Sequence, residues 1–378
     1  MATAVPIVPL KPEDSGLTRS SLPQIATRPL DDNQIQRLVE QGFTRGLSMS
    51  LNQMKEVFAL RIWIVDNSGS MQKTDGHRII PTKNRDVVKT VPCSRWEEIH
   101  ECVDYHIKLA GLIEAPTRFR LMNNPGANVG PQQFSVGEDP DRVVHDMQEA
   151  QSIMRKARPG GCTPLTSHIL DIQNEVFNMA PELRNKGQKV VIVIATDGLP
   201  TDERGYGGPQ HSQEFVEALR LLEGLPVWVV VRLCTDEDEV VEFYNELDGQ
   251  LELSMEVLDD FSGEAKEVTG ENPWLNYALP LHRLREMGYH DRVFDMLDER
   301  ALTKTEVRDF CALLFGEENF DGVPDPSLEW DAFLEEMKRL LKKESPQWVS
   351  DTVGFPSWLH CVDRPHRYTG FVTSYRTQ

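Results

Sequence analysis

The apolar run from Lys189 to Thr196 limits the possible folds more than any other feature of the chain. It reads KVVIVIAT and is almost continuous in β-branched residues. A strand with one face in water alternates apolar and polar side chains, whereas a strand covered on both faces is apolar throughout. We therefore expect residues 189–196 to form a central strand of a sheet with helices on both sides.

Strand and helix patterns alternate along the middle of the chain. Short apolar runs predict five more strands, and helical spacing of apolar residues predicts helices between them. One of these helices begins with the capping box Ser94-Arg95-Trp96-Glu97. Another is expected to begin at Asp139-Pro140, since Asp is a good N-cap and Pro fits the first helical position. The pattern predicts an α/β fold: a Rossmann-like, doubly wound, mostly parallel sheet flanked by helices. The further strands are expected at 60–65, 119–122, 133–136, 227–233 and 253–258.

The flanking segments differ in composition from this α/β region. Residues 1–30 are rich in Pro, Ser and Thr and are predicted to be disordered, and 31–58 carry a helical apolar stripe. The α/β domain is assigned to 59–268, with a long polar loop at 71–93. Beyond it, 269–345 form a mainly helical C-terminal extension. Residues 346–378 are irregular but rich in aromatic side chains, so we expect them to pack against the α/β domain.

Charge and cysteine content narrow the possible functions. The net charge is −20, from 60 acidic and 40 basic residues, which disfavours a general affinity for nucleic acid or an anionic membrane. No apolar run approaches the roughly 18 residues of a membrane span, and the first residues form no apolar leader. The six cysteines form no CxxC pair, so a zinc site of the usual spacing is not expected. Together these features predict a cytoplasmic protein with reduced thiols.

Oxygen-bearing side chains occur in three loops, each at or near a predicted strand-to-helix junction. The first loop carries Asp66, Ser68 and Ser70 directly after a strand, the second carries Thr163 after Gly160-Gly161, and the third carries Asp197. In a doubly wound fold such loops meet at the carboxyl edge of the sheet. Carboxylates and hydroxyls are ligands for a hard cation such as Mg²⁺, which also retains water. The bland alternative is that these residues only cap helices or form Asx turns.

The three loops, in this order, resemble those of a von Willebrand factor A domain with its metal-ion-dependent adhesion site. The resemblance covers roughly residues 55–268 and implies a Rossmann-like sheet with Mg²⁺ (or Mn²⁺) at its top. It implies that Ser68, Ser70 and Thr163 bind the ion directly, and that Asp66 and Asp197 often act through water. It also implies a protein partner that offers an Asp or Glu to the metal. Asp75 and His77 follow the first loop and are interpreted as loop residues.

Signatures of catalysis are missing from the sequence. It contains no GxxxxGK[ST], HExxH or GxSxG motif and no set of kinase motifs. We therefore expect a metal-dependent protein-interaction module that is not an enzyme. The alternatives are an accessory subunit of an ATP-driven complex and a metal-dependent hydrolase. The sequence does not indicate the oligomeric state.

Overall fold

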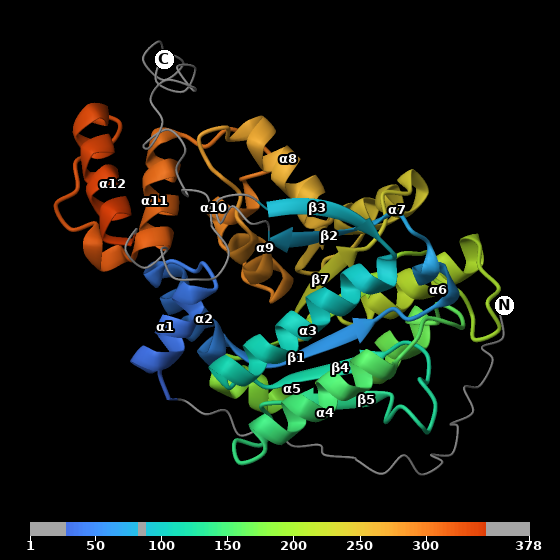
Figure 1. Ribbon diagram of the computed structural model, residues 1–378. Coiled ribbons are helices and arrows are strands. Elements are labelled where there is room, and N and C mark those ends of the chain that lie inside the picture. Colours follow the sequence, from blue (N-terminus) through green and yellow to red (C-terminus); the bar gives the residue numbers. More distant parts are fainter. Residues whose placement is uncertain (1–27, 82–87, 345–378) are drawn as a thin grey trace.

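A six-stranded sheet forms the centre of the computed structural model, which describes residues 28–81 and 88–344 (Figure 1). The expectations for residues 1–27 and for the tail from 345 onward lie outside these ranges. Five strands are parallel, and β5 at one edge runs antiparallel to its neighbour β4. The structure is thus α/β with a mostly parallel sheet. The strands are β1 (Phe58–Val65), β4 (Thr117–Leu121), β5 (Gln133–Val136), β6 (Lys189–Thr196), β7 (Val227–Leu233) and β8 (Met255–Leu258).

The chain adds strands first on one side of the sheet's centre and then on the other. The order across the sheet is β5-β4-β1-β6-β7-β8, so the chain first builds outward from β1 on one side and then outward from β6 on the other. At such a switch point the loops that leave the two central strands diverge to opposite faces, and ligands of open α/β sheets bind in the crevice between them. The switch point here lies at the carboxyl ends of β1 and β6.

Helices cover both faces of the sheet, as the uninterrupted apolar strands predict. Along β1, Trp63 and Val65 join an apolar cluster with α3 (Arg95–Ile113) and α4 (Val143–Lys156). Ile62 and Ile64 point the other way and join a cluster with α5 (Leu165–Lys186), α6 (Pro209–Arg220) and α7 (Asp238–Gln250). The period of two along a strand produces this division.

The segment 31–58 forms two helices where one helical stripe is predicted. They are α1 (Asp32–Glu40) and α2 (Arg45–Val57), and Gly42 between them has a φ of 94°, which L side chains rarely adopt. Gly46 lies inside α2, where a Cβ atom would come within 2.4 Å of the Leu313 carbonyl oxygen. Glycine here lets α2 approach the backbone of α11 (Lys304–Phe315) closely.

Two further predictions in the α/β region are wrong in detail. The expected loop at 71–93 contains a short 3-10 helix (Gly69–Gln72) and an antiparallel pair, β2 (Gly76–Pro81) with β3 (Val88–Cys93). Its prolines suggested a loop, but a two-stranded pair has open edges that tolerate a residue without an N–H. Helix α4 begins at Val143, not at Asp139, whose side chain accepts a hydrogen bond from the Asp141 amide (3.1 Å) in a turn.

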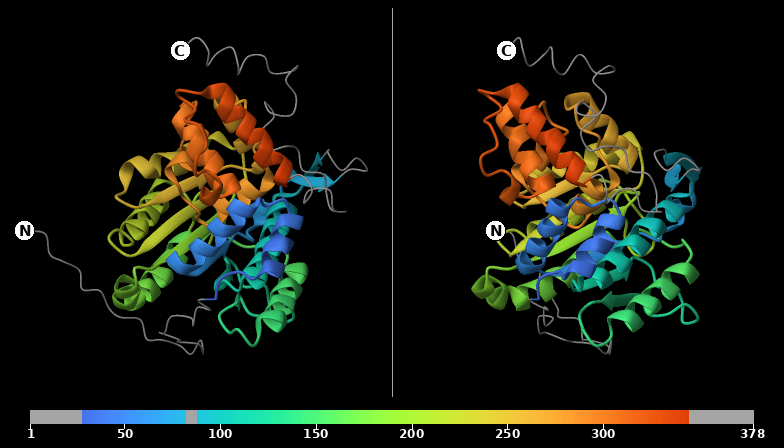
Figure 2. Two further views of the ribbon diagram at one scale, coloured as in Figure 1. Left: turned by 90° about the vertical axis from the view of Figure 1, so that its left-hand side faces the viewer. Right: turned by 60° about the vertical axis from the view of Figure 1, so that its left-hand side comes forward.

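Helices follow the last strand of the sheet. The described residues after β8 contain α8 (Phe261–Glu271), α9 (Leu279–Glu286), α10 (Arg292–Asp295), α11, a 3-10 helix (Glu317–Asn319) and α12 (Trp330–Glu344). In Figure 2 the orange and red helices of this segment lie beside the blue α1 and α2. The Arg45 amide at the start of α2 donates to Glu344 Oε2 (3.4 Å) at the end of α12. None of the helices in the described ranges is both long and apolar enough to span a membrane.

Candidate metal site

Asp66 and Asp197 lie side by side at the switch point of the sheet. Each is the residue directly after a central strand, β1 or β6. The Asp66 amide donates to the Ala195 carbonyl (2.9 Å), which extends the parallel ladder by one residue beyond β1. Both side chains are buried, at 0% and 2% exposure. The sheet itself therefore sets the position of the two carboxylates.

The serines of the first loop connect these two carboxylates through hydrogen bonds. Ser68 Oγ and Ser70 Oγ are 2.9 Å apart, and Ser70 Oγ donates to Asp197 Oδ1 (2.8 Å). Asp66 is held at both oxygens, because Oδ1 accepts from the Ser68 amide (2.7 Å) and Oδ2 accepts from Thr196 Oγ1 (2.7 Å). The first and third predicted loops are thus joined through side chains.

The second loop reaches the same place through backbone hydrogen bonds. The Gly69 amide donates to the Gly161 carbonyl (3.1 Å), and the Gly160 amide donates to the Asn67 carbonyl (2.7 Å). Thr163 Oγ1 lies 4.0 Å from the point that a Cβ atom on Gly198 would occupy, so it borders the third loop. All five residues predicted to form the metal site therefore gather at one edge of the sheet.

Asn123 fixes the second loop, although its sequence context gave no indication of this role. Its Oδ1 accepts from the Cys162 amide (3.2 Å), its Nδ2 donates to the Cys162 carbonyl (2.7 Å), and its own amide donates to Asn67 Oδ1 (2.7 Å). Gly161 has a φ of 100°, and a Cβ atom there would lie 2.4 Å from Asn123 Oδ1. The side-chain amide of Asn123 therefore requires glycine at position 161.

A buried arginine behind the site also escaped the sequence analysis. The Arg95 side chain is 1% exposed, and its Nη1 donates to Asp197 Oδ2 (2.9 Å). Its other nitrogens donate to both oxygens of Asp75 (2.7 and 2.5 Å) and to Glu237 (2.7 Å), which also pairs with Lys73 (2.5 Å). Asp75 is therefore more than the loop residue that we expected. Only the capping box marked this region in the sequence, and it does not distinguish Arg95 from any other first-turn residue.

The electrostatics of the site favour an added cation. Burial, and secondarily the neighbouring Asp197, raises the pKa of Asp66 to about 6. Hydrogen bonds from Arg95 lower the pKa of Asp75, and those from Lys73 and Arg95 lower the pKa of Glu237. With all groups ionised, four carboxylates face Arg95 and Lys73, so the connected cluster carries a net charge of −2. A divalent cation would neutralise it.

The donor set fits magnesium. Every predicted ligand atom is an oxygen, from two carboxylates and three hydroxyls, which suits a hard cation that keeps several waters. Gly69, Gly160 and Gly161 at the rim are exposed and have no side chains to cover the site. A Cβ atom added at Gly160 would have no other atom within 4 Å. A group from outside could thus approach the hydroxyls over this rim.

The sequence matches no model of a protein family, and no curated protein is similar enough to count as a match.

Proposed function

We propose that residues 59–268 form a Rossmann-like, doubly wound von Willebrand factor A-type domain that binds Mg²⁺ (or Mn²⁺) and captures a partner protein through one of its Asp or Glu side chains. Asp66, Ser68, Ser70, Thr163 and Asp197 are the proposed metal-site residues. Their convergence at the switch point of the sheet is the observation that carries the proposal. It is most direct in the 2.8 Å contact between Ser70 Oγ and Asp197 Oδ1.

Each residue at the proposed metal site has a distinct role. The three hydroxyls offer neutral oxygen lone pairs, while Asp66 and Asp197 provide negative charge without crowding the site. Thr196 and the Ser68 amide orient Asp66, and Arg95 orients Asp197. A bound Mg²⁺ would supply a positive charge and an exchangeable coordination position for the oxygen of a partner.

The rim supports capture of a carboxylate better than it supports catalysis. The exposed glycines leave room for an approaching acidic side chain. The three hydroxyls are neutral ligands, so the direct coordination shell of a divalent ion would still lack a carboxylate, which an Asp or Glu of a partner can supply. No observation specifically favours hydrolysis or attachment to an ATP-driven machine.

Metal binding can be tested without knowing the partner. Free Mn²⁺ is measured by electron paramagnetic resonance during titration of the wild type, of Asp66→Ala and of Glu203→Ala. Glu203 is an exposed acidic residue beside the third loop and serves as the matched control. We expect the wild type and Glu203→Ala to bind Mn²⁺ and Asp66→Ala to lose binding by about 10–100-fold, the usual range for a group that acts on the metal through water. Equal binding by all three proteins would refute the metal site.

Partner capture is tested separately by affinity purification from the native source. Proteins recovered with the wild type in Mg²⁺ should be absent with Asp66→Ala and absent when a chelator is added. They should remain with Glu203→Ala. Recovery of the same proteins under all conditions would exclude metal-dependent capture, and turnover of phosphate esters that depends on Asp66 would favour the hydrolase alternative.

A further inference from the structure

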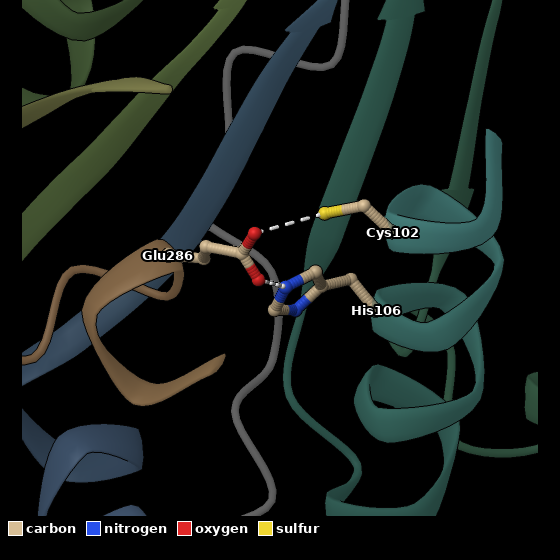
Figure 3. Close-up of side chains that lie close together, drawn as sticks. All are labelled: Cys102, His106 and Glu286. Atoms are coloured by element: carbon tan, nitrogen blue, oxygen red, sulfur yellow. Dashed lines mark hydrogen bonds and ion pairs between the residues drawn. The ribbon is translucent and has the colours of Figure 1, made fainter. Parts of the chain in front are cut away.

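A second cluster of metal-binding side chains lies between α3 and α9, away from the site at the sheet edge. Cys102 and His106 are four residues apart on α3, and His282 and Glu286 are four residues apart on α9. Residues at this spacing lie on one face of a helix, one turn apart. In Figure 3 Cys102 and His106 point from α3 toward Glu286 on the facing segment. All four residues are buried.

The ligand atoms of three of these residues lie close together. Cys102 Sγ lies 3.2 Å from Glu286 Oε1, and His106 Nε2 lies 2.9 Å from Glu286 Oε2. The ligand atoms of these three residues all lie within 4.8 Å of one another. Zinc bonds of about 2.0–2.3 Å in a tetrahedron imply ligand-to-ligand separations of roughly 3.3–3.6 Å. These three side chains are therefore already within reach of one ion, whereas His282 lies outside this group of three and contacts it through Glu286 Oε1 (3.3 Å).

His282 adds an imidazole nitrogen that the protein leaves without a hydrogen-bond partner. Its Nε2 is buried and lies 3.3 Å from Glu286 Oε1, but it makes no contact with the geometry of a hydrogen bond. Its Nδ1 lies 3.3 Å from Tyr277 Oη, which can hold the ring in one orientation. Metal-binding histidines are commonly fixed in this way through their second nitrogen. The His282 nitrogen thus faces the carboxylate without a well-formed hydrogen bond, which leaves it available to a cation bound by Glu286.

The surrounding charges permit a cation at this position. Arg283 Nη1 donates to Glu286 Oε2 (2.7 Å), and Arg232 Nη2 pairs with Glu98 (2.5 Å). Although burial opposes ionisation, Arg283 holds the pKa of Glu286 well below its ordinary value. The two arginines and two glutamates balance, so the pocket is close to neutral before an ion enters. Arg283 would then act as the outer hydrogen-bond donor that ligating carboxylates usually have.

We propose that Cys102, His106, His282 and Glu286 bind a Zn²⁺ ion that joins α3 to α9. Four protein ligands leave no open position, which is the arrangement of a structural zinc site. Zinc is bound by a thiolate, so the Cys102 thiol must give up its proton. Binding exchanges that proton for a zinc–sulfur bond and releases one proton to solvent.

A small cavity offers the ion a route to the ligands. Its volume is about 60 Å³, and its lining includes Cys102, His282 and Glu286. The same lining includes Glu101, which is exposed, so the cavity reaches the surface of α3. The ligands come from two separate helices and not from a CxxC pair. This explains why spacing along the chain gave no indication of zinc.

Cobalt substitution tests the proposal on the full-length protein. The chain is purified without metal-affinity chromatography, and its zinc content is measured by mass spectrometry. The zinc is then removed and replaced by Co²⁺, whose bond to a thiolate gives a charge-transfer band in the near ultraviolet. We expect about one zinc ion per chain and a cobalt–thiolate band that persists in Asp66→Ala. The oxygen site at the sheet edge contributes no thiolate, so failure of one site is distinguishable from failure of the other.

Matched variants assign the band to its ligands. Cys102→Ala should abolish the band, whereas Cys311→Ala, a change at another buried cysteine, should keep it. His106→Gln and His282→Gln should each weaken zinc binding by more than about 100-fold, a larger loss than for an outer-shell residue. Wild-type protein that contains no zinc and shows no thiolate band with Co²⁺ would overturn the proposal, whatever the variants do. Persistence of the band in folded Cys102→Ala would also overturn it.

Discussion

Replacing Asp66 by Asn should stabilise the protein when no metal is present and destabilise it relative to the wild type when Mg²⁺ is added. Asn has nearly the same shape as Asp but carries no charge. In the folded chain Asp66 is fully buried beside Asp197, and these surroundings raise its pKa from 3.8 to about 6. The neutral side chain is thus the form that the metal-free fold prefers.

The size of the effect follows from the shift in pKa. A raised pKa in an acid means that the folded state binds the proton more tightly than the unfolded state. The contribution of Asp66 to stability is therefore greatest below pH 3.8 and falls as the pH rises to about 6. At about 1.4 kcal/mol per pH unit, this loss amounts to about 3 kcal/mol at pH 7. Asn avoids that loss because it carries no charge. Rearranging the hydrogen bond from Thr196 to the Asn side chain costs about 1 kcal/mol, which is subtracted from the gain.

The assay is thermal unfolding of the two proteins, followed by tryptophan fluorescence in EDTA and in millimolar Mg²⁺. In EDTA at pH 7 we expect Asp66→Asn to be more stable by about 2 kcal/mol, a rise in Tm of roughly 4 °C. The difference should disappear near pH 4, where the wild-type carboxyl is protonated. Mg²⁺ should raise the Tm of the wild type alone, because binding to the folded state stabilises it by mass action. A less stable Asn variant in EDTA, or equal stabilisation of both proteins by Mg²⁺, would refute the reasoning.

Three other substitutions probe the parts around this carboxylate. Ser70→Ala removes a proposed ligand and the donor to Asp197 Oδ1. The Mn²⁺ affinity measured by electron paramagnetic resonance should therefore fall at least about 10-fold. The far-ultraviolet circular dichroism should stay unchanged. Arg95→Met leaves Asp197 buried without its cation, so the free energy of unfolding measured with a chemical denaturant in EDTA should fall by about 3–5 kcal/mol. An unchanged unfolding midpoint would show that the Arg95–Asp197 pair does not stabilise the fold. Gly161→Ala meets Asn123 and adopts a φ of 100°, so the Tm should fall even in EDTA, whereas Gly160→Ala at an open position should have little effect.

The elements that carry the site could be predicted because their signals are local. The run KVVIVIAT forms β6 with the expected bounds, and the capping box at Ser94 is present. The first residue after each central strand is identified once the strand is identified, so Asp66 and Asp197 followed directly. Parallel strands then bring those residues to one edge of the sheet without further information.

The partners of the site could not be predicted, because they come from long-range packing. Arg95 reaches Asp197 from 102 residues away along the chain, and Asn123 reaches Cys162 across 39. Neither contact leaves a periodic pattern or a motif. The β2–β3 pair was missed for a related reason. Proline usually indicates a loop, so the residue types alone predicted one. The open edges of a two-stranded pair tolerate proline, and the segment forms strands.

The packing between distant segments argues against treating the α/β region as independent of the helices that follow it. Gly288, just after α9, has a φ of 85°, and a Cβ atom there would come within 2.7 Å of Val191 Cγ1 on the central strand β6. Arg61 on β1 donates through Nε to the Met287 carbonyl (3.3 Å), and Glu286 contacts His106 on α3. Removing α9 and the residues just after it would take this acceptor from Arg61 and would uncover the apolar side chains of β6. Exposing apolar surface costs roughly 25 cal/mol per Å², so the segment after β8 is part of what keeps the central strands, and therefore Asp66 and Asp197, in place.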